Sequence, residues 1–233
     1  MNTVFTEQRS IGQIVADDFR AATIFKQAGI DFCCGGNKSI TEACEEKQVD
    51  PRDLISQLTE LTSTTTAPAF DFKNWDLGFL SDYIVNTHHQ FVRKNLPDLL
   101  FYTQKIAAVH GENHPELQVV EDLFYQINKE LTQHLQHEEE VLFPAIKAVL
   151  ANGSAEAKAS IISEISRMTG EHEFAGGAMD KINEITGGYK IPGDACNTYR
   201  VALKQLEAFE DDLHIHVHLE NNILFPKALN LAK

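Results

Sequence analysis

The sequence has few basic residues, and no segment of it is uniformly apolar. It contains 20 Lys and Arg against 34 Asp and Glu, which leaves a formal charge of −14 on 233 residues. Such an acidic chain repels a phosphate backbone, which disfavours nucleic-acid binding. No run approaches the roughly 18 apolar residues that a membrane helix needs. The first residues, MNTVFTEQRS, lack the basic and apolar regions of a secretory signal. The sequence therefore predicts a cytoplasmic protein with no membrane and no nucleic-acid partner.

Histidine and cysteine are each missing from a long part of the chain. The first 87 residues contain no histidine and the remainder contains all ten, whereas three of the four cysteines lie early, at Cys33, Cys34 and Cys44. Four cysteines, two of them adjacent, do not make the framework of a secreted disulfide-rich domain. The opposite distribution of these two residue types predicts two parts with different chemistry.

A stretch without charge or periodicity separates the two parts. Residues 62–69, TSTTTAPA, are small and polar and include a proline, which is typical of a linker. We therefore expect a small helical domain at 1–62, a linker at 63–71 and a larger domain at 72–233.

The predicted fold class is all-α, because no convincing run of alternating strand pattern is present. In the small domain we expect a helix at 11–28, a second from Ser39, where S-I-T-E matches a capping box, and a third from Pro51. In the larger domain glycine- and asparagine-containing breaks separate four long helical patterns. These predicted helices span 74–111, 115–151, 154–186 and 193–230.

The larger domain contains an internal repeat. The segments that begin at His134 and His216 both read H-x-x-x-E-x-x-[VI]-L-F-P, at an offset of 82 residues, and His89 and His172 match more weakly at an offset of 83. Such self-similarity predicts two helical hairpins related by an approximate two-fold axis. The other histidines of these segments have no counterpart, and we interpret them as surface residues or as residues behind a site: His88, His137, His214 and His218.

The repeated residues lie where a bundle helix should be apolar. Around His134 and His216 the apolar residues follow alternating steps of three and four, a pattern that includes Val141 and is typical of the inward seam of a bundle helix. Two facing buried carboxylates are costly unless they are protonated or compensated by cations. The pattern therefore predicts a pair of metal ions held by His89, His134, Glu138, His172, His216 and Glu220.

Nitrogen and oxygen donors with bridging carboxylates suit iron or manganese. If both glutamates bridge and each ion takes two histidines, positions stay open for water, an oxo group or a small diatomic molecule. His110 shares a face with His89 but lies 21 residues further on, some 30 Å along a straight helix. We place it outside the ligand set.

The doubled motif on a four-helix bundle resembles a hemerythrin-like di-iron domain. The early segment Gly29-Ile-Asp-Phe-Cys33-Cys34-Gly35-Gly36 resembles the small domain that precedes it in the Repair of Iron Centres family, and together the two features cover nearly the whole chain. This resemblance implies a cytoplasmic bacterial protein that repairs iron–sulfur clusters damaged by nitrosative or oxidative stress. Its partners would be damaged or metal-free iron–sulfur proteins and nitric oxide, and its chemistry iron donation, nitric oxide reduction or both.

The resemblance also implies a ligand set. The cofactor would be two iron ions with oxo and carboxylate bridges, Glu138 and Glu220 would bridge, and the histidines of the repeat would be terminal ligands. Oxygen-carrying hemerythrins have a further histidine where this chain has Gly176. They also have aspartate rather than glutamate after the last histidine. These departures disfavour an oxygen carrier.

The adjacent cysteines suggest a second chemistry. Cys33 and Cys34 lie in a glycine-bounded turn just before the helix expected from Ser39, whose N-terminus would lower the thiol pKa. The two thiolates could bind iron, accept nitrosyl or form a vicinal disulfide, and the alternative is an ordinary packed turn. We interpret Cys44 and Cys196 as structural.

Two other function classes fit the same residues. One is a di-iron module that binds or senses oxygen or nitric oxide and does not need the cysteines. The other is a helical interaction protein whose bundle holds zinc structurally, which predicts a colourless protein that unfolds without metal. An exposed small domain would also allow a homodimer.

Overall fold

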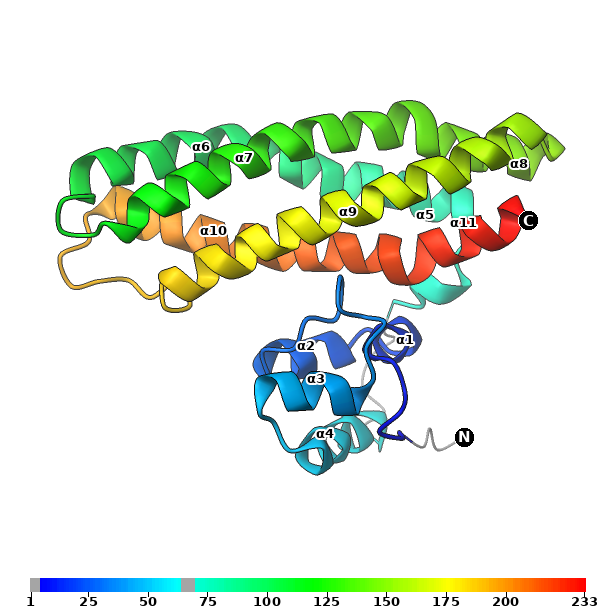
Figure 1. The fold of residues 1–233 in the computed structure, drawn as a ribbon, viewed down its shortest axis with the longest axis horizontal. Helices are drawn as coiled ribbons and strands as arrows, with labels where there is room; N and C mark the ends of the chain where they lie inside the picture. Colours follow the sequence, from blue (N-terminus) through cyan, green and yellow to red (C-terminus); the bar gives the residue numbers. More distant parts are fainter. Residues whose placement is uncertain (1–4, 64–69) are drawn as a thin grey trace.

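The computed structural model describes residues 5–63 and 70–233. A small group of helices packs beneath a long helical bundle (Figure 1). No β-strand forms in these two ranges, where an isolated bridge pairs Ser10 with Ser39. Among the helices described there, none is both long and apolar enough to cross a lipid bilayer.

The small domain consists of α1 (Ile11–Asp17), α2 (Ala21–Gln27), α3 (Ile40–Lys47) and α4 (Pro51–Ser63). Ser39 and Glu42 form the predicted capping box, and Pro51 begins α4 as expected. The single helix predicted at 11–28 is wrong. Asp18 adopts an extended conformation and its carboxylate accepts hydrogen bonds from the backbone and side chain of Arg20, so the chain turns there.

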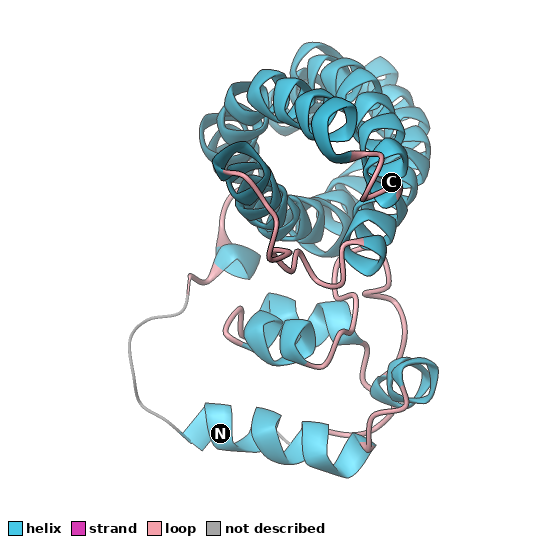
Figure 2. Cartoon of the chain, turned by 90° about the vertical axis from the view of Figure 1, so that its left-hand side faces the viewer, coloured by secondary structure: helices cyan, strands magenta, loops and turns pink. Residues whose placement is uncertain are grey.

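The bundle contains the four rods predicted from the sequence, and Figure 2 shows them end-on around a common axis. After a short 3₁₀ turn, η1 (Phe72–Asn74), the first rod comprises α5 (Leu77–Ile84), η2 (Val85–His89) and α6 (Gln90–His110). The second comprises α7 (Glu116–His137), η3 (Glu138–Leu142) and α8 (Phe143–Asn152). The third is the uninterrupted α9 (Ala155–Ile185), and the fourth comprises α10 (Asn197–Leu219), η4 (Glu220–Leu224) and α11 (Phe225–Ala232).

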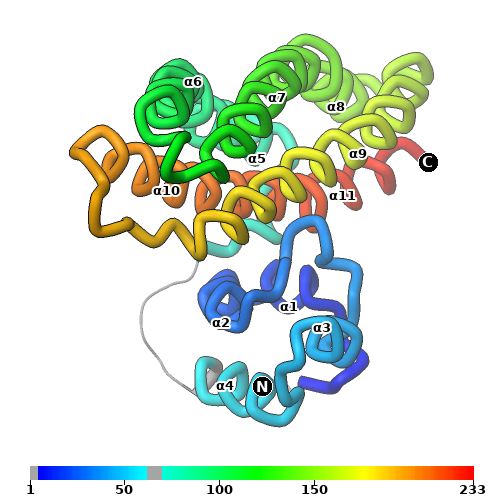
Figure 3. The backbone as a smooth tube through the Cα atoms, turned by 60° about the vertical axis from the view of Figure 1, so that its left-hand side comes forward, coloured from blue at the N-terminus to red at the C-terminus, as the bar shows by residue number. Residues whose placement is uncertain are grey.

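The predicted linker at 63–71 falls mainly on residues 64–69, which lie outside the described residues. The tube view in Figure 3 shows the two parts that flank it, with the loop between α2 and α3 reaching up to the bundle near α9 and α10.

The apolar core of the bundle is divided into two clusters. One contains the small domain together with α6, α7, α10 and the second half of α9, and it includes Val92 and Leu135. The other contains α5, α8, α11 and the first half of α9, and it includes Leu142 and Met168. All four rods pass from one cluster to the other at the level of the buried histidines and glutamates. The polar residues therefore form a layer across the middle of an otherwise apolar interior.

Candidate metal centre

The six residues predicted as ligands come together inside the bundle, and each is at most 1% exposed. Their donor atoms form two overlapping groups, within each of which all four atoms lie within 4.8 Å of one another. Both glutamates belong to both groups, whereas each histidine belongs to one. The first group contains His89 and His216, and the second contains His134 and His172.

The spacing of the donor atoms suits metal ions shared by the two carboxylates. Glu138 Oε2 lies 3.3 Å from Nε2 of both His89 and His134. Glu220 lies 3.1 Å from Nε2 of His172 and 3.0 Å from Nε2 of His216. Because metal–nitrogen and metal–oxygen bonds are about 2.0–2.2 Å long, two ligands of one ion lie roughly this far apart.

Several of these atoms are buried without a hydrogen-bond partner in the described part of the chain. They include Nε2 of His89, both oxygens of Glu138 and Oε2 of Glu220. In addition, Nε2 of His172 faces Nε2 of His134 at 3.1 Å, so two ring nitrogens point at the same space. Unpaired buried polar atoms are costly, and coordination of cations would satisfy them. The residues present therefore fit a metal pair.

Most ring nitrogens on the far side from the centre are anchored. Nδ1 of His89 contacts Glu139 at 2.7 Å, Nδ1 of His134 contacts Glu171 at 2.7 Å, and Nδ1 of His172 contacts Asn221 at 2.9 Å. An acceptor at Nδ1 keeps the proton there and leaves the Nε2 lone pair for a metal.

These three anchoring residues were not identified from the sequence, although each is adjacent in the chain to a ligand. His216 differs from the other histidines because its Nδ1 has no partner among the described residues, and its ring stacks on His88 with centroids 5.6 Å apart. His88 in turn contacts Asp212 at 3.0 Å. His88 therefore lies behind the ligand set, which is one of the two placements predicted for it: on the surface or behind a site.

Charge balance in the centre favours ionised carboxylates. Burial and the charge of Glu220 oppose ionisation of Glu138, but His134 and His89 outweigh them and lower its pKa to about 2. Burial opposes protonation of His89 and His134, but the two glutamates raise the pKa of His89 to about 9 and that of His134 to about 10. Without metal, protonated imidazoles compensate the carboxylates, and metal cations would replace those protons.

Three of the four rods change to a π-helical turn at the ligands. His89 ends η2, Glu138 begins η3 and Glu220 begins η4. A π-turn inserts one extra residue per turn and is frequent at functional sites. The prediction that Val141 lies on the inward seam is therefore wrong: Val141 is 37% exposed and Leu142 is fully buried in its place.

The F-P pair that ends each repeat explains the position of η3 and η4. Pro144 and Pro226 lack the N–H that would close an α-turn onto residues 140 and 222, and each follows its π-turn directly after a phenylalanine. The repeat predicted from the sequence is reflected in the matching positions of the π-turns in these two rods. This match does not extend to α9, which is continuous through His172.

The loop with Cys33 and Cys34 lies directly against the bundle. The Asp31 carboxylate accepts hydrogen bonds from the backbone N–H groups of Cys33, Cys34 and Gly35 at 2.7–3.1 Å, which fixes the loop. Sγ of Cys34 lies 3.5 Å from the carbonyl oxygen of His172.

Gly176 lies one helical turn after His172 on α9. In this chain, a Cβ built there would lie 3.2 Å from the Cys34 sulfur. The cysteine loop thus packs directly against Gly176.

The predicted acidity of the cysteines is wrong for Cys33. Its pKa lies well above the usual value because of the neighbouring Cys34, its own burial and the Asp31 carboxylate. The N-terminus of α3 does not compensate for these effects. Cys33 is therefore a buried neutral thiol in this arrangement, with its sulfur 3.9 Å from that of Cys34.

The remaining histidines and cysteines lie apart from the donor groups. His110 contacts the sulfur of Cys196 at 3.2 Å and belongs to neither donor group. Cys44 is fully buried, as a structural residue would be. Cys196 is exposed at the N-cap of α10, so the helix predicted at 193–230 begins after this residue and not before it. His218 is fully buried against Phe32 of the small domain and is not a surface residue.

A four-helix bundle with a buried histidine–glutamate layer defines the class of hemerythrin-like proteins. Residues 81–228 match the family described as the Hemerythrin HHE cation binding domain, and residues 7–62 match a Domain of Unknown function (DUF542). The two matches correspond to the bundle and to the small domain.

Curated relatives resemble the chain over nearly its whole length. The iron–sulfur cluster repair protein ScdA of Staphylococcus haemolyticus is 35% identical over 224 residues, which cover 96% of this chain and 99% of ScdA. The iron–sulfur cluster repair protein YtfE of Musicola paradisiaca is 33% identical over 225 residues, covering 95% and 96%. The chain belongs to this ScdA and YtfE family. The resemblance inferred from its motifs is confirmed.

Proposed function

We propose that the six buried side chains hold two iron ions with an oxo bridge. His89 and His216 would bind one ion, His134 and His172 the other, and Glu138 and Glu220 both. This assignment is supported by the overlap of the two donor groups. Both groups contain the two carboxylates, and each group contains its own pair of histidines. Bound iron would supply redox chemistry and open coordination positions.

The chain's own contribution is to shape and dry the site. The two apolar clusters on either side of the polar layer exclude water, and complete burial keeps the local dielectric low. Glu139, Glu171 and Asn221 hold three of the imidazoles in one orientation. The centre is thereby kept ready for ions.

The proposed activity is repair of iron–sulfur clusters, which the names of the relatives suggest, and we assign the damage to nitrosative or oxidative stress. We assign Cys33 and Cys34 to iron or nitric oxide handling, because Cys34 touches the backbone of His172. The clients would be damaged or metal-free iron–sulfur proteins in the cytoplasm. All four cysteines are free thiols, which is consistent with that reducing compartment. We divide the chain into a cysteine domain at 1–62 and a di-iron domain at 72–233.

Metal analysis and the visible spectrum test the centre. We expect about two irons per chain and an oxo-bridge absorption, both lost in the Glu138→Ala/Glu220→Ala double variant. Glu140→Ala is the matched control, since Glu140 is exposed two residues from Glu138, and it should retain both signals. Circular dichroism reports whether each variant is folded. A colourless zinc protein, or iron that persists in the folded double variant, contradicts the di-iron assignment.

A comparison with cysteine variants distinguishes a repair activity from a sensing activity. Protein loaded with isotopically labelled iron is mixed with a metal-free iron–sulfur enzyme, and label transfer and nitric oxide consumption are both measured. Iron donation predicts transfer, and nitric oxide reduction predicts consumption. In Cys33→Ser/Cys34→Ser, repair should fall while iron content is unchanged. Reversible nitric oxide binding without transfer or turnover, unaffected by these substitutions, would instead indicate the sensing module.

A further inference from the structure

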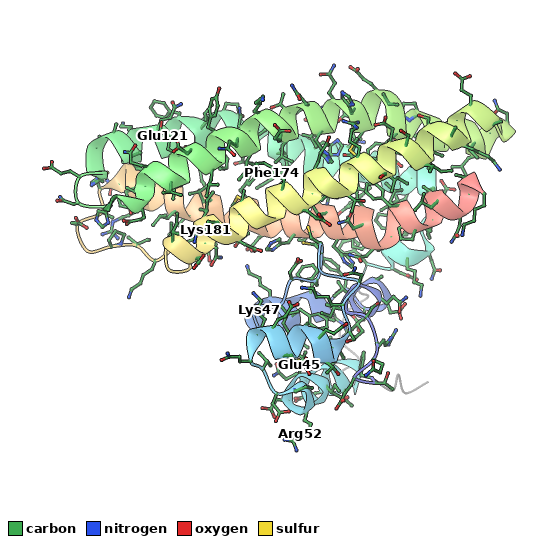
Figure 4. The ribbon with its side chains drawn as sticks, viewed as in Figure 1. Glu45, Lys47, Arg52, Glu121, Phe174 and Lys181 are labelled. Carbon is green, nitrogen blue, oxygen red and sulfur yellow. The ribbon has the colours of Figure 1, made fainter. Side chains whose placement is uncertain are left out.

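A cavity of about 600 Å³ lies between the small domain and the bundle, away from the buried centre. Its walls come from the turn after α2, from α3 and from the facing sides of α9 and α10. In Figure 4, Lys47 on α3 and Lys181 on α9 mark the two sides. Asp31, which fixes the cysteine loop, also lines this cavity.

Three potential ligands gather on the bundle side of the cavity. One donor atom each of Asp180, Glu210 and His214 lies within 4.8 Å of the other two, and all three residues line the cavity. Glu210 and His214 are one turn apart on α10, and Asp180 comes from α9. None of the six ligands of the buried centre belongs to this group.

The surroundings compensate the acidic groups of this cluster only in part. Glu210 is 4% exposed, and the one hydrogen bond that its side chain is described as making comes from Asn183 at 2.9 Å. The adjacent Tyr189 is 6% exposed, and its hydroxyl favours ionisation of Glu210 without reaching normal hydrogen-bond geometry to any group of the described chain. A buried carboxylate beside a second carboxylate and an unpaired hydroxyl is an environment that a cation would stabilise.

Two of the three lysines that line the cavity have partners outside the cluster. Lys26 pairs with Asp211 and Lys181 pairs with Glu184. Burial raises the pKa of Asp180 above its ordinary value and the charge of Asp31 adds to the shift, although His214 and Lys47 oppose it. Burial likewise raises the pKa of Glu210, with Asp180 adding to the shift. At both carboxyls burial therefore outweighs the neighbouring groups that favour ionisation.

We propose that Asp180, Glu210 and His214 bind a divalent transition-metal cation at a second site, separate from the buried centre. Two carboxylates and one imidazole suit Mn²⁺, Fe²⁺ or Zn²⁺, and water from the cavity completes the coordination of such a three-ligand site. The proposal concerns binding alone and stands whether or not the chain repairs iron–sulfur clusters.

The place of this site gives it a simple use. Asp180 lies two helical turns beyond His172 on α9, and Gly176, against which Cys34 packs, is between them. A cation at the second site would thus lie about one helical turn along α9 from the glycine that packs against the thiol loop. A further use, which rests on the proposed iron donation, is to hold iron that enters or leaves the protein.

Titration with Mn²⁺ tests the site in the full chain with its buried centre already filled with iron. The paramagnetic resonance signal of free aqueous Mn²⁺ measures binding. We expect one site per chain, and at least a tenfold higher Kd in Asp180→Asn and in Glu210→Gln. Glu184→Gln is the matched control, because it removes the same charge from the same cavity outside the cluster. This control should bind like the parent chain.

Circular dichroism and the iron content of each variant show that fold and buried centre are intact. The proposal is overturned if the parent chain binds no Mn²⁺, or if Asp180→Asn and Glu210→Gln bind as tightly as the parent. It is also overturned if Glu184→Gln weakens binding as much as they do, since the effect would then be general electrostatics.

Discussion

Asn222 holds the cysteine loop on the bundle, and its removal should expose the buried thiol. Its Nδ2 donates to the carbonyl oxygens of Phe32 at 3.3 Å and Cys33 at 3.1 Å. Gly36 packs so closely that a Cβ there would lie 2.5 Å from Asn222 Oδ1. In Asn222→Ala the two carbonyls lose their donor while the rest of η4 is unchanged.

The size of the effect follows from these two hydrogen bonds. A hydrogen bond contributes a net of about 1 kcal/mol, so docking of the loop should weaken by about 2 kcal/mol. Since 1.4 kcal/mol is tenfold, the open population should rise about 30-fold. Cys33 is 3% exposed and reacts only when the loop opens. Its alkylation rate should therefore rise by about the same factor.

Alkylation is followed by peptide mass spectrometry, which separates Cys33 from the other cysteines. Asn230→Ala is the control, because Asn230 is exposed on α11 and accepts a hydrogen bond from Lys233 at the chain end. This variant should react at the parent rate, and neither change should alter metal content. An unchanged Cys33 rate in folded Asn222→Ala would refute the argument that these contacts hold the loop closed.

Three further predictions concern packing, register and acidity. Gly170→Ala should raise the free energy of unfolding by about 1 kcal/mol through helix propensity, because nothing lies within 4 Å of the added Cβ. Gly176→Ala should gain less stability because its Cβ meets a sulfur at 3.2 Å. Thermal melting compares the two variants. Leu142→Ala should cost about 2–5 kcal/mol and Val141→Ala less than about 1 kcal/mol in denaturant titration, and equal costs would contradict the π-turn. Hydrogen bonds from α10 backbone N–H groups and from a neighbouring histidine lower the pKa of Cys196 to about 7. Its alkylation should accordingly rise with pH around a midpoint near 7, and a midpoint near 9 would contradict this environment.

The repeat was sufficient to predict which side chains meet. Each half of the bundle places a histidine and a glutamate at core positions of the same helix, and four rods around one axis can bring such positions to one level. His89 and His172 were found from the weaker half of the same repeat. The all-α class followed from the helical periodicities and from the breaks between them.

The local geometry could not be predicted from periodicity alone. The steps of three and four assume an unbroken α-helix, and they therefore selected Val141 where η3 buries Leu142. The available signal for the π-turns was the F-P pair that ends each repeat, because its proline lacks the N–H that an α-helix needs at that position.

The docking of the small domain depends on side chains that no local pattern marks. Asn222 and Gly36 are distant in the chain and meet only in the folded protein. The acidity of Cys33 was mispredicted for the same reason, because Asp31 and burial act through tertiary structure. Cys196 likewise acquires His110 as a partner from another helix.

The turn η4 places three consecutive residues in three different roles. Glu220 faces the buried centre, Asn221 anchors His172, and Asn222 holds the cysteine loop. Because successive helical residues are rotated by about 100°, gain or loss of one residue in this turn would redirect all the side chains beyond it. An insertion or deletion there would disturb the centre and the domain contact together. The length of η4 is therefore fixed by the metal centre and by the domain contact together, and variation in this turn is restricted to substitutions.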